Sequence, residues 1–260
     1  MKKFTSSLSL IVLIVLAIWQ YFTDSTKTKN QSSSPVIEQT KQTKVSEPKF
    51  EPQFETKRTD IEKSAVKNSN VFANYDVIMR DDPIGQNAKA PVDYYMLALS
   101  WSPGFCDIQR EKYGNQLPSS SQYQCGNNRT LGWVVHGLWP QNANALSVTD
   151  HPRFCKGDLP ALPKDLLAQY LAISPGEQLL QGEWEKHGSC AFDSAQQYFA
   201  KEQELFSSLK LPNQNLSRNE LFRWMKQHNP QLKNAYLGAS RNELFICYDK
   251  KWQVMNCQSK

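Results

Sequence analysis

The chain has 260 residues, of which 40% are hydrophobic and 11% aromatic, which suits one domain with extensions or two small domains. Residues 1–90 hold 13 Lys and Arg against 10 Asp and Glu (+3), and residues 91–260 hold 17 against 15 (+2), giving a formal net charge of +5. A protein that binds many phosphates usually has a denser basic face. The composition therefore argues against an extended nucleic-acid-binding surface and leaves contact with a few phosphates open.

The N-terminus has the pattern of an export signal. Two lysines precede an apolar or small-residue run, Leu8–Ile18, which is short for a membrane span and typical of a signal-peptide core. The aromatic residues that follow, up to Phe22, resemble an interfacial belt, and no Ala-x-Ala cleavage site follows them. We expect residues 1–22 to be a signal peptide or an uncleaved anchor. Either one places the remainder in the periplasm or outside the cell, tethered to the membrane through residues 8–22 if the anchor is kept.

Two segments precede the predicted domain. Residues 23–70 are rich in Ser, Thr, Lys, Gln, Glu and Pro, which predicts a flexible polar tether, with a disordered interaction tail as the alternative. Residues 71–91 regain apolar side chains and are expected to form an N-terminal arm that packs on the domain. The domain itself is predicted over residues 92–260.

Two strands are predicted first. Tyr94–Trp101 is an apolar run of strand length, closed by Ser102-Pro103-Gly104, and we expect a buried central strand there. Leu131–His136 contains adjacent valines and predicts a second strand, stopped by Gly137 and Pro140. His136 is thus expected at the exit of a strand.

The predicted helices begin at Pro163–Ala172, with the proline at the first helical position. Ser174 is a candidate cap for a next helix that leads toward Glu183, and Gly182 is expected to interrupt it.

The C-terminal third carries three further signals. Capping boxes at Ser194–Gln197 and Ser217–Glu220 predict two helices of about three turns each. Leu244–Tyr248 and Trp252–Val254, separated by a polar turn, predict a hairpin.

All six cysteines lie in the predicted domain, at Cys106, Cys125, Cys155, Cys190, Cys247 and Cys257. An even number in an exported chain favours disulfides. The spacing of Cys247 and Cys257 favours a bond that clamps the last hairpin. A metal cluster is the alternative, but the sequence has no Cys-x-x-Cys pair.

The segment Gly182–Cys190 concentrates acid and base groups. If it is helical, Glu183, Lys186 and His187 stand at i, i+3 and i+4 and share one face, while Trp184 points toward the core. A carboxylate, an ammonium and an imidazole held together indicate an acid–base site. A solvated, ion-paired helical turn explains the same spacing equally well.

A second histidine strengthens the acid–base interpretation. His136 lies in His-Gly-Leu-Trp-Pro, beside a glycine that permits close approach and the flat face of Trp139. A lone histidine at a strand end is more often structural, but His136 and His187 together can supply one base and one acid. His151 and His228 lack such neighbours, and we expect them in surface or loop positions.

Three segments together resemble the ribonuclease T2 family. Val134–Pro140 (Val-Val-His-Gly-Leu-Trp-Pro) and Glu183–Cys190 (Glu-Trp-Glu-Lys-His-Gly-Ser-Cys) are similar to its two active-site segments, and Leu99–Cys106 to its first strand and turn. The resemblance covers residues 92–257. It implies an α+β fold with a central antiparallel β-sheet flanked by several α-helices. It also implies the disulfides Cys106–Cys125, Cys155–Cys190 and Cys247–Cys257.

The resemblance further implies a monomeric endoribonuclease that needs no metal or other cofactor and acts on single-stranded RNA with weak base preference. His187 would be the general base on the ribose 2′-hydroxyl, and His136 would protonate the departing 5′-oxygen. Lys186 and Glu183 would stabilise the crowded phosphorane, and Trp139 would stack on the base 5′ to the cut. The products would be 2′,3′-cyclic phosphates, converted slowly to 3′-phosphates.

Two positions depart from the family pattern, and two other functions compete. Gly182 stands where many members have a third histidine that binds phosphate, and Gln141 where many fungal members have an acidic residue. One alternative is a non-catalytic T2-like module that binds RNA or protein. The other is a metal-dependent phosphodiesterase with His136 and His187 as ligands, although the chain lacks an obvious carboxylate-rich ligand set.

Overall fold

The computed structural model describes residues 75–114, 116–126 and 131–258. The predicted signal peptide or anchor, the tether and the first four residues of the arm lie outside these described residues. Within them, none of the helices combines the length and the apolar character that crossing a membrane requires.

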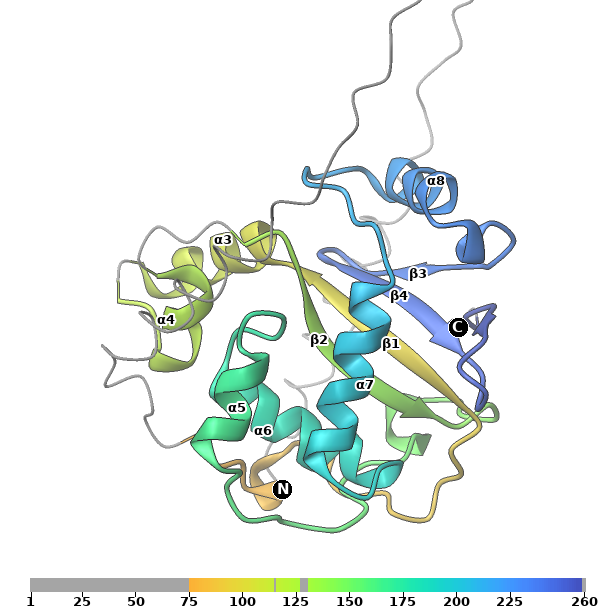
Figure 1. The fold of residues 1–260 in the computed structure, drawn as a ribbon. Coiled ribbons are helices and arrows are strands. Elements are labelled where there is room, and N and C mark those ends of the chain that lie inside the picture. The colour runs from red at the N-terminus through yellow and green to blue at the C-terminus, as the bar shows by residue number, and fades with distance from the viewer. Residues whose placement is uncertain (1–74, 115, 127–130, 259–260) are drawn as a thin grey trace, which may run out of the picture. The chain divides into compact units, whose positions relative to one another are not determined.

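An antiparallel sheet organises the domain, with β1 at its centre (Figure 1). β1 pairs with β2 on one side and β4 on the other, β3 follows β4, and β5 also pairs with β4. The strands are β1 (Tyr94–Trp101), β2 (Trp133–Gln141), β3 (Gly238–Ala239), β4 (Glu243–Tyr248) and β5 (Val254–Met255). The prediction of a central first strand is confirmed over its full length, and the α+β fold class is confirmed with it.

The helices of the described residues are α3 (Ser102–Tyr113), α4 (Ser119–Cys125), α5 (Lys164–Tyr170), α6 (Glu177–Lys186), α7 (Ala195–Ser207) and α8 (Arg218–His228). Short 3-10 helices are η1 (Met79–Asp81), η2 (Val148–Asp150), η3 (Gly188–Cys190) and η4 (Pro230–Leu232).

One face of the sheet forms the main core. Successive strand residues point to opposite faces, so Leu97 and Leu99 of β1 face the same side, and both are fully buried. They join Leu244 and Ile246 of β4 in a cluster with apolar side chains of α5, α6 and α7, the helices that cover this face in Figure 1. Complete burial of one such side chain contributes roughly 1.5–3 kcal/mol to stability.

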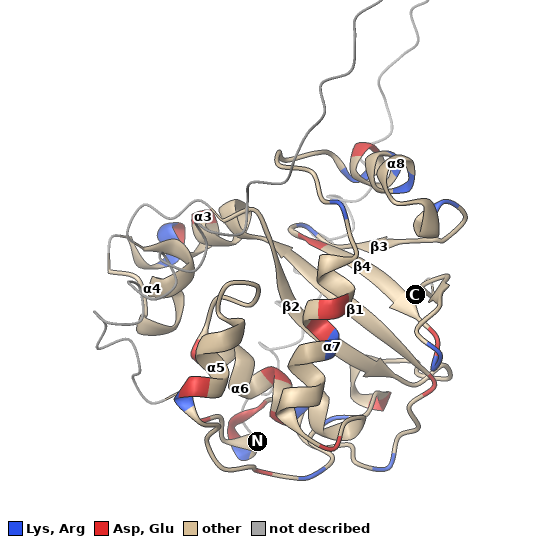
Figure 2. Ribbon diagram, viewed as in Figure 1, with Lys and Arg blue, Asp and Glu red and all other residues tan. Residues whose placement is uncertain are grey.

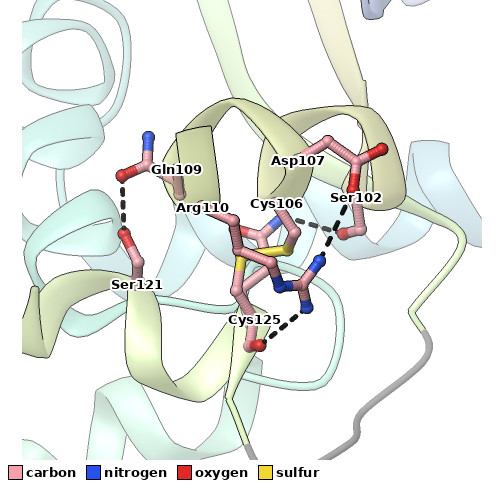
Figure 3. The surroundings of a disulfide bond; sticks show 8 residues. Ser102, Cys106, Asp107, Gln109, Arg110, Ser121 and Cys125 are labelled. Atoms are coloured by element: carbon pink, nitrogen blue, oxygen red, sulfur yellow. Dashed lines mark hydrogen bonds and ion pairs between the residues drawn. A yellow bond between two sulfur atoms is a disulfide. The ribbon is translucent and has the colours of Figure 1, made fainter. Parts of the chain in front are cut away.

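The segment after β1 differs from its prediction. Ser102-Pro103-Gly104 does not form a turn but begins α3, because proline is tolerated in the first turn of a helix, where its missing N–H costs no hydrogen bond. The Cys106–Cys125 disulfide then joins α3 to α4 (Figure 3). Arg110 Nη2 donates to the Cys125 carbonyl at 3.1 Å and reinforces this junction.

The boundaries of α5 and α6 correct three expectations. Pro163 precedes α5 as its cap residue and is not its first helical residue. Gly176 stands at the N-cap of α6 in place of Ser174, which is buried. Gly182 does not interrupt α6, since helix continues through it to Lys186, where tertiary packing outweighs the roughly 1 kcal/mol cost of a helical glycine.

The predicted caps of the last two helices are confirmed. The Ser194 side chain accepts from the backbone N–H of Gln197 at the start of α7. Ser217 and Glu220 form a complete capping box at the start of α8. The predicted hairpin is present as β4 and β5, which the Cys247–Cys257 disulfide clamps.

The described part of the arm lies against the domain. The Tyr75 hydroxyl donates to the Leu162 carbonyl at 2.6 Å, and Gln86 Nε2 donates to the Phe154 carbonyl at 2.8 Å. Asn87 and Arg153 exchange both backbone hydrogen bonds at 3.0 Å, as two paired strand residues do.

Charged side chains of both signs are interspersed over the helices and loops, and β1 and β2 carry none of them (Figure 2). His136 is the titratable residue of β2, and the other titratable groups that matter for chemistry reach this strand from neighbouring segments.

Candidate active site

β2 is longer than predicted. The predicted strand ended at His136, before Gly137 and Pro140, but the strand continues through both residues to Gln141. Proline is tolerated because β2 is an edge strand of the sheet, so its missing N–H removes no bond from the middle of a ladder. His136 consequently lies inside the strand and not at its exit.

A β-bulge presents His136. Ala98 of β1 pairs with Gly137, and Leu99 pairs with Val135, so His136 is the extra residue between two paired positions. A bulge bends the strand and reorients the side chain of the unpaired residue. The His136 side chain is 35% exposed, which leaves it accessible to a substrate.

The Glu183 carboxylate lies between the two histidines predicted to act. Its Oε1 is 3.6 Å from His136 Nε2, and its Oε2 is 4.0 Å from His187 Nε2. Trp139 donates its indole N–H to the same Oε2 at 2.7 Å. The sequence prediction that α6 and the His-Gly-Leu-Trp-Pro segment form one site therefore agrees with this geometry.

Gly137 makes that approach possible. A Cβ atom at this position would overlap Glu183 Oε2 and would lie 2.6 Å from Trp139 Nε1, closer than real Cβ contacts. The glycine between His136 and Trp139 is thus required by the space that the carboxylate occupies.

Glu243, at the start of β4, orients His136. His136 Nδ1 lies 2.6 Å from Glu243 Oε1, and the other carboxylate oxygen accepts from the Ser240 hydroxyl at 3.0 Å. Burial alone would lower the pKa of His136, but the hydrogen bond to Glu243 and the charge of Glu183 raise it above its ordinary value. With Nδ1–H directed at Glu243, Nε2 faces the site.

His187 has the opposite electrostatic environment. It follows α6 directly, is 8% exposed, and its Nδ1 has no hydrogen-bond partner among the described residues. Burial lowers its pKa well below the ordinary value, and the positive charges of Arg153 and Lys186 lower it further. The surroundings therefore favour the neutral form of His187 and the charged form of His136.

Lys186 is paired with an acid from outside the predicted site. Its Nζ lies 2.9 Å from Asp82 Oδ2, in the arm. The same carboxylate binds Arg153 at 2.9 Å through its other oxygen. The Cys155–Cys190 disulfide joins the segment after Arg153 to the segment after His187 and holds these cations near the imidazoles.

The described residues contain no group of three or more His, Cys, Asp or Glu side chains arranged to hold a metal ion. The arrangement places two imidazoles with oppositely shifted pKa values beside the Glu183 carboxylate, with Lys186 one helical turn further along α6. These groups suit proton transfer beside an anion.

Comparison with known proteins agrees with this arrangement. The sequence profile described as the Ribonuclease T2 family matches residues 92–257, which contain both histidines, Glu183 and Lys186. The chain belongs to the ribonuclease T2 family. As a member of that family it is an RNA endonuclease.

Individual relatives of this T2 chain span a wide range of similarity. A probable ribonuclease of Haemophilus influenzae is 87% identical over 100% of both chains. A ribonuclease of Aeromonas hydrophila is 37% identical over 38% of each. The solved structure of trichomaglin, described as an S-like ribonuclease, has a TM-score of 0.48 and 18% identity, covering 65% of this chain and 92% of that one.

In this T2 domain, sequence reasoning missed Glu243, Asp82 and Arg153. A signal existed for Glu243, because it alternates with Leu244 and Ile246 and so lies on the face of β4 away from the main core, next to β1. The sequence gives no comparable signal for Asp82 or Arg153.

The two remaining histidines lie in a loop and at the surface, as expected. His151 is in the loop after η2 but is only 7% exposed, and its Nδ1 lies 3.2 Å from the backbone N–H of Asn142, which fixes the loop after β2. His228 is exposed near the end of α8, as expected, and stacks on Trp224.

Proposed function

We propose that this ribonuclease T2 protein cleaves single-stranded RNA without a metal, by attack of the ribose 2′-hydroxyl on the adjacent phosphorus. The observation that supports this best is the opposite shift of two imidazole pKa values on either side of Glu183. A neutral base and a protonated acid can then coexist at one pH, which general acid–base catalysis requires.

His187 is the proposed base. Its neutral ring takes the proton from the 2′-hydroxyl as the 2′-oxygen forms a bond to phosphorus. His136 is the proposed acid, and its Nε2–H gives a proton to the 5′-oxygen as the phosphorus–oxygen bond breaks. The immediate product is a 2′,3′-cyclic phosphate. Its slow hydrolysis to a 3′-phosphate uses the same two groups in reversed roles.

Lys186 and Glu183 are proposed to act on the phosphorane. An ammonium group stabilises negative charge that develops on the non-bridging oxygens. Glu183 lies within 4.0 Å of both imidazoles and would polarise the crowded centre. Trp139 is proposed to stack on the base 5′ to the cut, and stacking of this kind tolerates many sequences.

The test is cleavage of RNA and DNA of one sequence by the full chain in excess chelator, with analysis of the RNA ends. We expect 2′,3′-cyclic phosphates from RNA and no cleavage of DNA, which lacks the 2′-hydroxyl. His136→Ala and His187→Ala should each lower kcat by roughly 10²- to 10⁴-fold. His228→Ala, at an exposed histidine of α8, is the matched control and should leave kcat unchanged.

Other outcomes separate the alternatives. Cleavage that returns only with added metal would favour the metal-dependent phosphodiesterase. RNA binding without cleavage under any condition would favour the non-catalytic module. Unchanged rates in both histidine variants would overturn the assigned roles.

We also propose that the protein is exported and held at the membrane by its N-terminal segment. Three disulfides support an oxidising compartment. Fractionation of expressing cells should place the full chain with the membrane and accessible to protease from outside the cytoplasm. Recovery of reduced chain in the cytoplasm would contradict the proposal.

A further inference from the structure

The N-terminal arm reaches the active site from outside the family domain. The matched region begins at residue 92, whereas Asp82 contacts the proposed phosphate-stabilising lysine at 2.9 Å. This acid therefore belongs to a segment that the family profile does not include.

Asp82 is held in place by four donors. Its Oδ1 accepts from the backbone N–H groups of Ile84 at 2.9 Å and Gly85 at 3.1 Å, and from Arg153 Nη2 at 2.9 Å. Its Oδ2 contacts Lys186 Nζ at 2.9 Å. The side chain is only 9% exposed. Burial would raise the pKa of Asp82, but these donors hold it well below its ordinary value.

Asp82 is the counter-ion of the buried Arg153 side chain. Its side chain is 6% exposed, and its Nε has no hydrogen-bond partner among the described residues. A buried guanidinium without an opposite charge is strongly destabilising, so Asp82 compensates it. The backbone pairing of Arg153 with Asn87 fixes the arm beside it.

The arm also covers the flank of α6 at the position that departs from the family pattern. A Cβ atom on Gly182 would lie 3.4 Å from Val77 Cγ2 of the arm. A larger side chain at residue 182 would compete with the arm for this space. The lack of a side chain at Gly182 thus leaves room for the arm beside α6.

We propose that the arm is a working part of the active site, in which Asp82 is a positioning residue that holds the Lys186 ammonium in place for the phosphorane. A free lysine side chain loses rotamer entropy when it is fixed. Asp82 fixes it before the substrate binds, so that cost is removed from the reaction step. Lys186 keeps two further N–H donors, and the Arg153, Asp82 and Lys186 group retains a net positive charge.

This inference rests on the proposed function, and the test compares Asp82→Asn with Asp81→Asn in the full chain. Asp81 is the matched control, since its side chain is 70% exposed and its ion pair is with exposed Arg80. We expect Asp82→Asn to lower kcat by about 10- to 100-fold with little change in KM, as for a misplaced catalytic group. Asp81→Asn should match the parent chain.

A double variant separates positioning from folding. Asp82→Asn leaves Arg153 buried without its counter-ion, so the single variant should unfold at a lower temperature. Asp82→Asn with Arg153→Met removes both partners and should regain much of the lost stability. We expect kcat to stay low in the double variant, because Lys186 is still unheld. Recovery of kcat together with stability would assign Asp82 a structural role only and overturn the inference.

Two further outcomes also count against the proposal. An Asp82→Asn chain as fast as the parent would show that the ion pair has no role in the reaction. A faster one would show that the arm inhibits by competing with phosphate for Lys186.

A measurement without RNA keeps this test distinct from that of the proposed function. The acylation rate of Lys186, followed by peptide mass spectrometry, should rise in Asp82→Asn relative to exposed lysines and stay unchanged in Asp81→Asn. If the parent chain cut no RNA, the proposed function would fail, while this rate would still report whether Asp82 holds Lys186. An unchanged rate in Asp82→Asn would refute the positioning role.

Discussion

His136 and His187 carry the same side chain, and their surroundings shift their pKa values in opposite directions. His136 has Glu243 at 2.6 Å and Glu183 at 3.6 Å, and both acids favour its charged form. His187 is buried near Arg153 and Lys186, and desolvation and these cations favour its neutral form. The direction of proton transfer that we propose would therefore be set by neighbouring charges and not by the histidines themselves.

Glu243→Gln tests this at the residue scale. The rate should rise with pH as His187 loses its proton and fall as His136 loses its own. Glutamine keeps an acceptor for Nδ1–H but removes the charge, so the pKa of His136 falls and the alkaline limb of the pH–rate profile moves to lower pH. The acidic limb should stay in place.

The loss of kcat at the optimum should be smaller than that of His136→Ala, which we expect to be roughly 10²- to 10⁴-fold. Glu111→Gln, at an exposed glutamate of α3, is the control and should leave both limbs unchanged. An alkaline limb unmoved in Glu243→Gln would mean that Glu243 does not set the charge of His136.

At the element scale, α7 buries an acid as well as apolar side chains. Glu202 is 1% exposed and follows Tyr198 by one turn, and the Tyr198 hydroxyl accepts from the backbone N–H of Leu138 in β2. Burial raises the pKa of Glu202 well above its ordinary value, and the charge of Glu183 adds to this. The helix thus holds behind β2 a buried carboxyl whose raised pKa favours its protonated form.

The contribution of Glu202 to stability should consequently decrease with pH. Below about pH 4.5 Glu202 is protonated in both the folded and the unfolded chain, and it adds no pH dependence. As pH rises from there through the folded-state pKa, the unfolded chain ionises first and is favoured. Glu202→Gln should remove this dependence of stability on pH. At pH 8 the variant should unfold at a higher temperature than the parent chain, because its free energy of unfolding is larger by on the order of 1 kcal/mol or more. At pH 4 the two chains should unfold alike, and a parallel decline in both would contradict the assignment.

Local sequence patterns were sufficient to predict some of the helices and strands. β1, the caps of α7 and α8 and the last hairpin rest on local signals, namely apolar runs and capping side chains, and these were predictable. β2, α3 and α6 were misjudged because Gly137, Pro103 and Gly182 usually end or interrupt regular structure. Gly137 leaves the space that Glu183 occupies, Pro103 lies in the first turn of α3, and the packing of α6 outweighs the cost of Gly182.

At the scale of the whole molecule, the sequence identified the site by its two histidine segments but not by its supporting charges. His136, Glu183, Lys186 and His187 lie in short motifs, whereas Asp82, Arg153 and Glu243 are brought in by long-range packing. Their separation in sequence reaches 107 residues for the His136–Glu243 pair. Only the folded chain reveals these partners.

The irregular form of β2 also affects how separate molecules meet. A long, flat edge strand exposes unpaired backbone groups that can recruit a strand from another molecule. The His136 bulge bends this edge, Pro140 offers no N–H, and the Val135 N–H is already bound to the Ile173 carbonyl. The opposite edge, β3, is only two residues long. The irregularities of β2 that shape the active site thereby also protect the sheet against aggregation through strand addition.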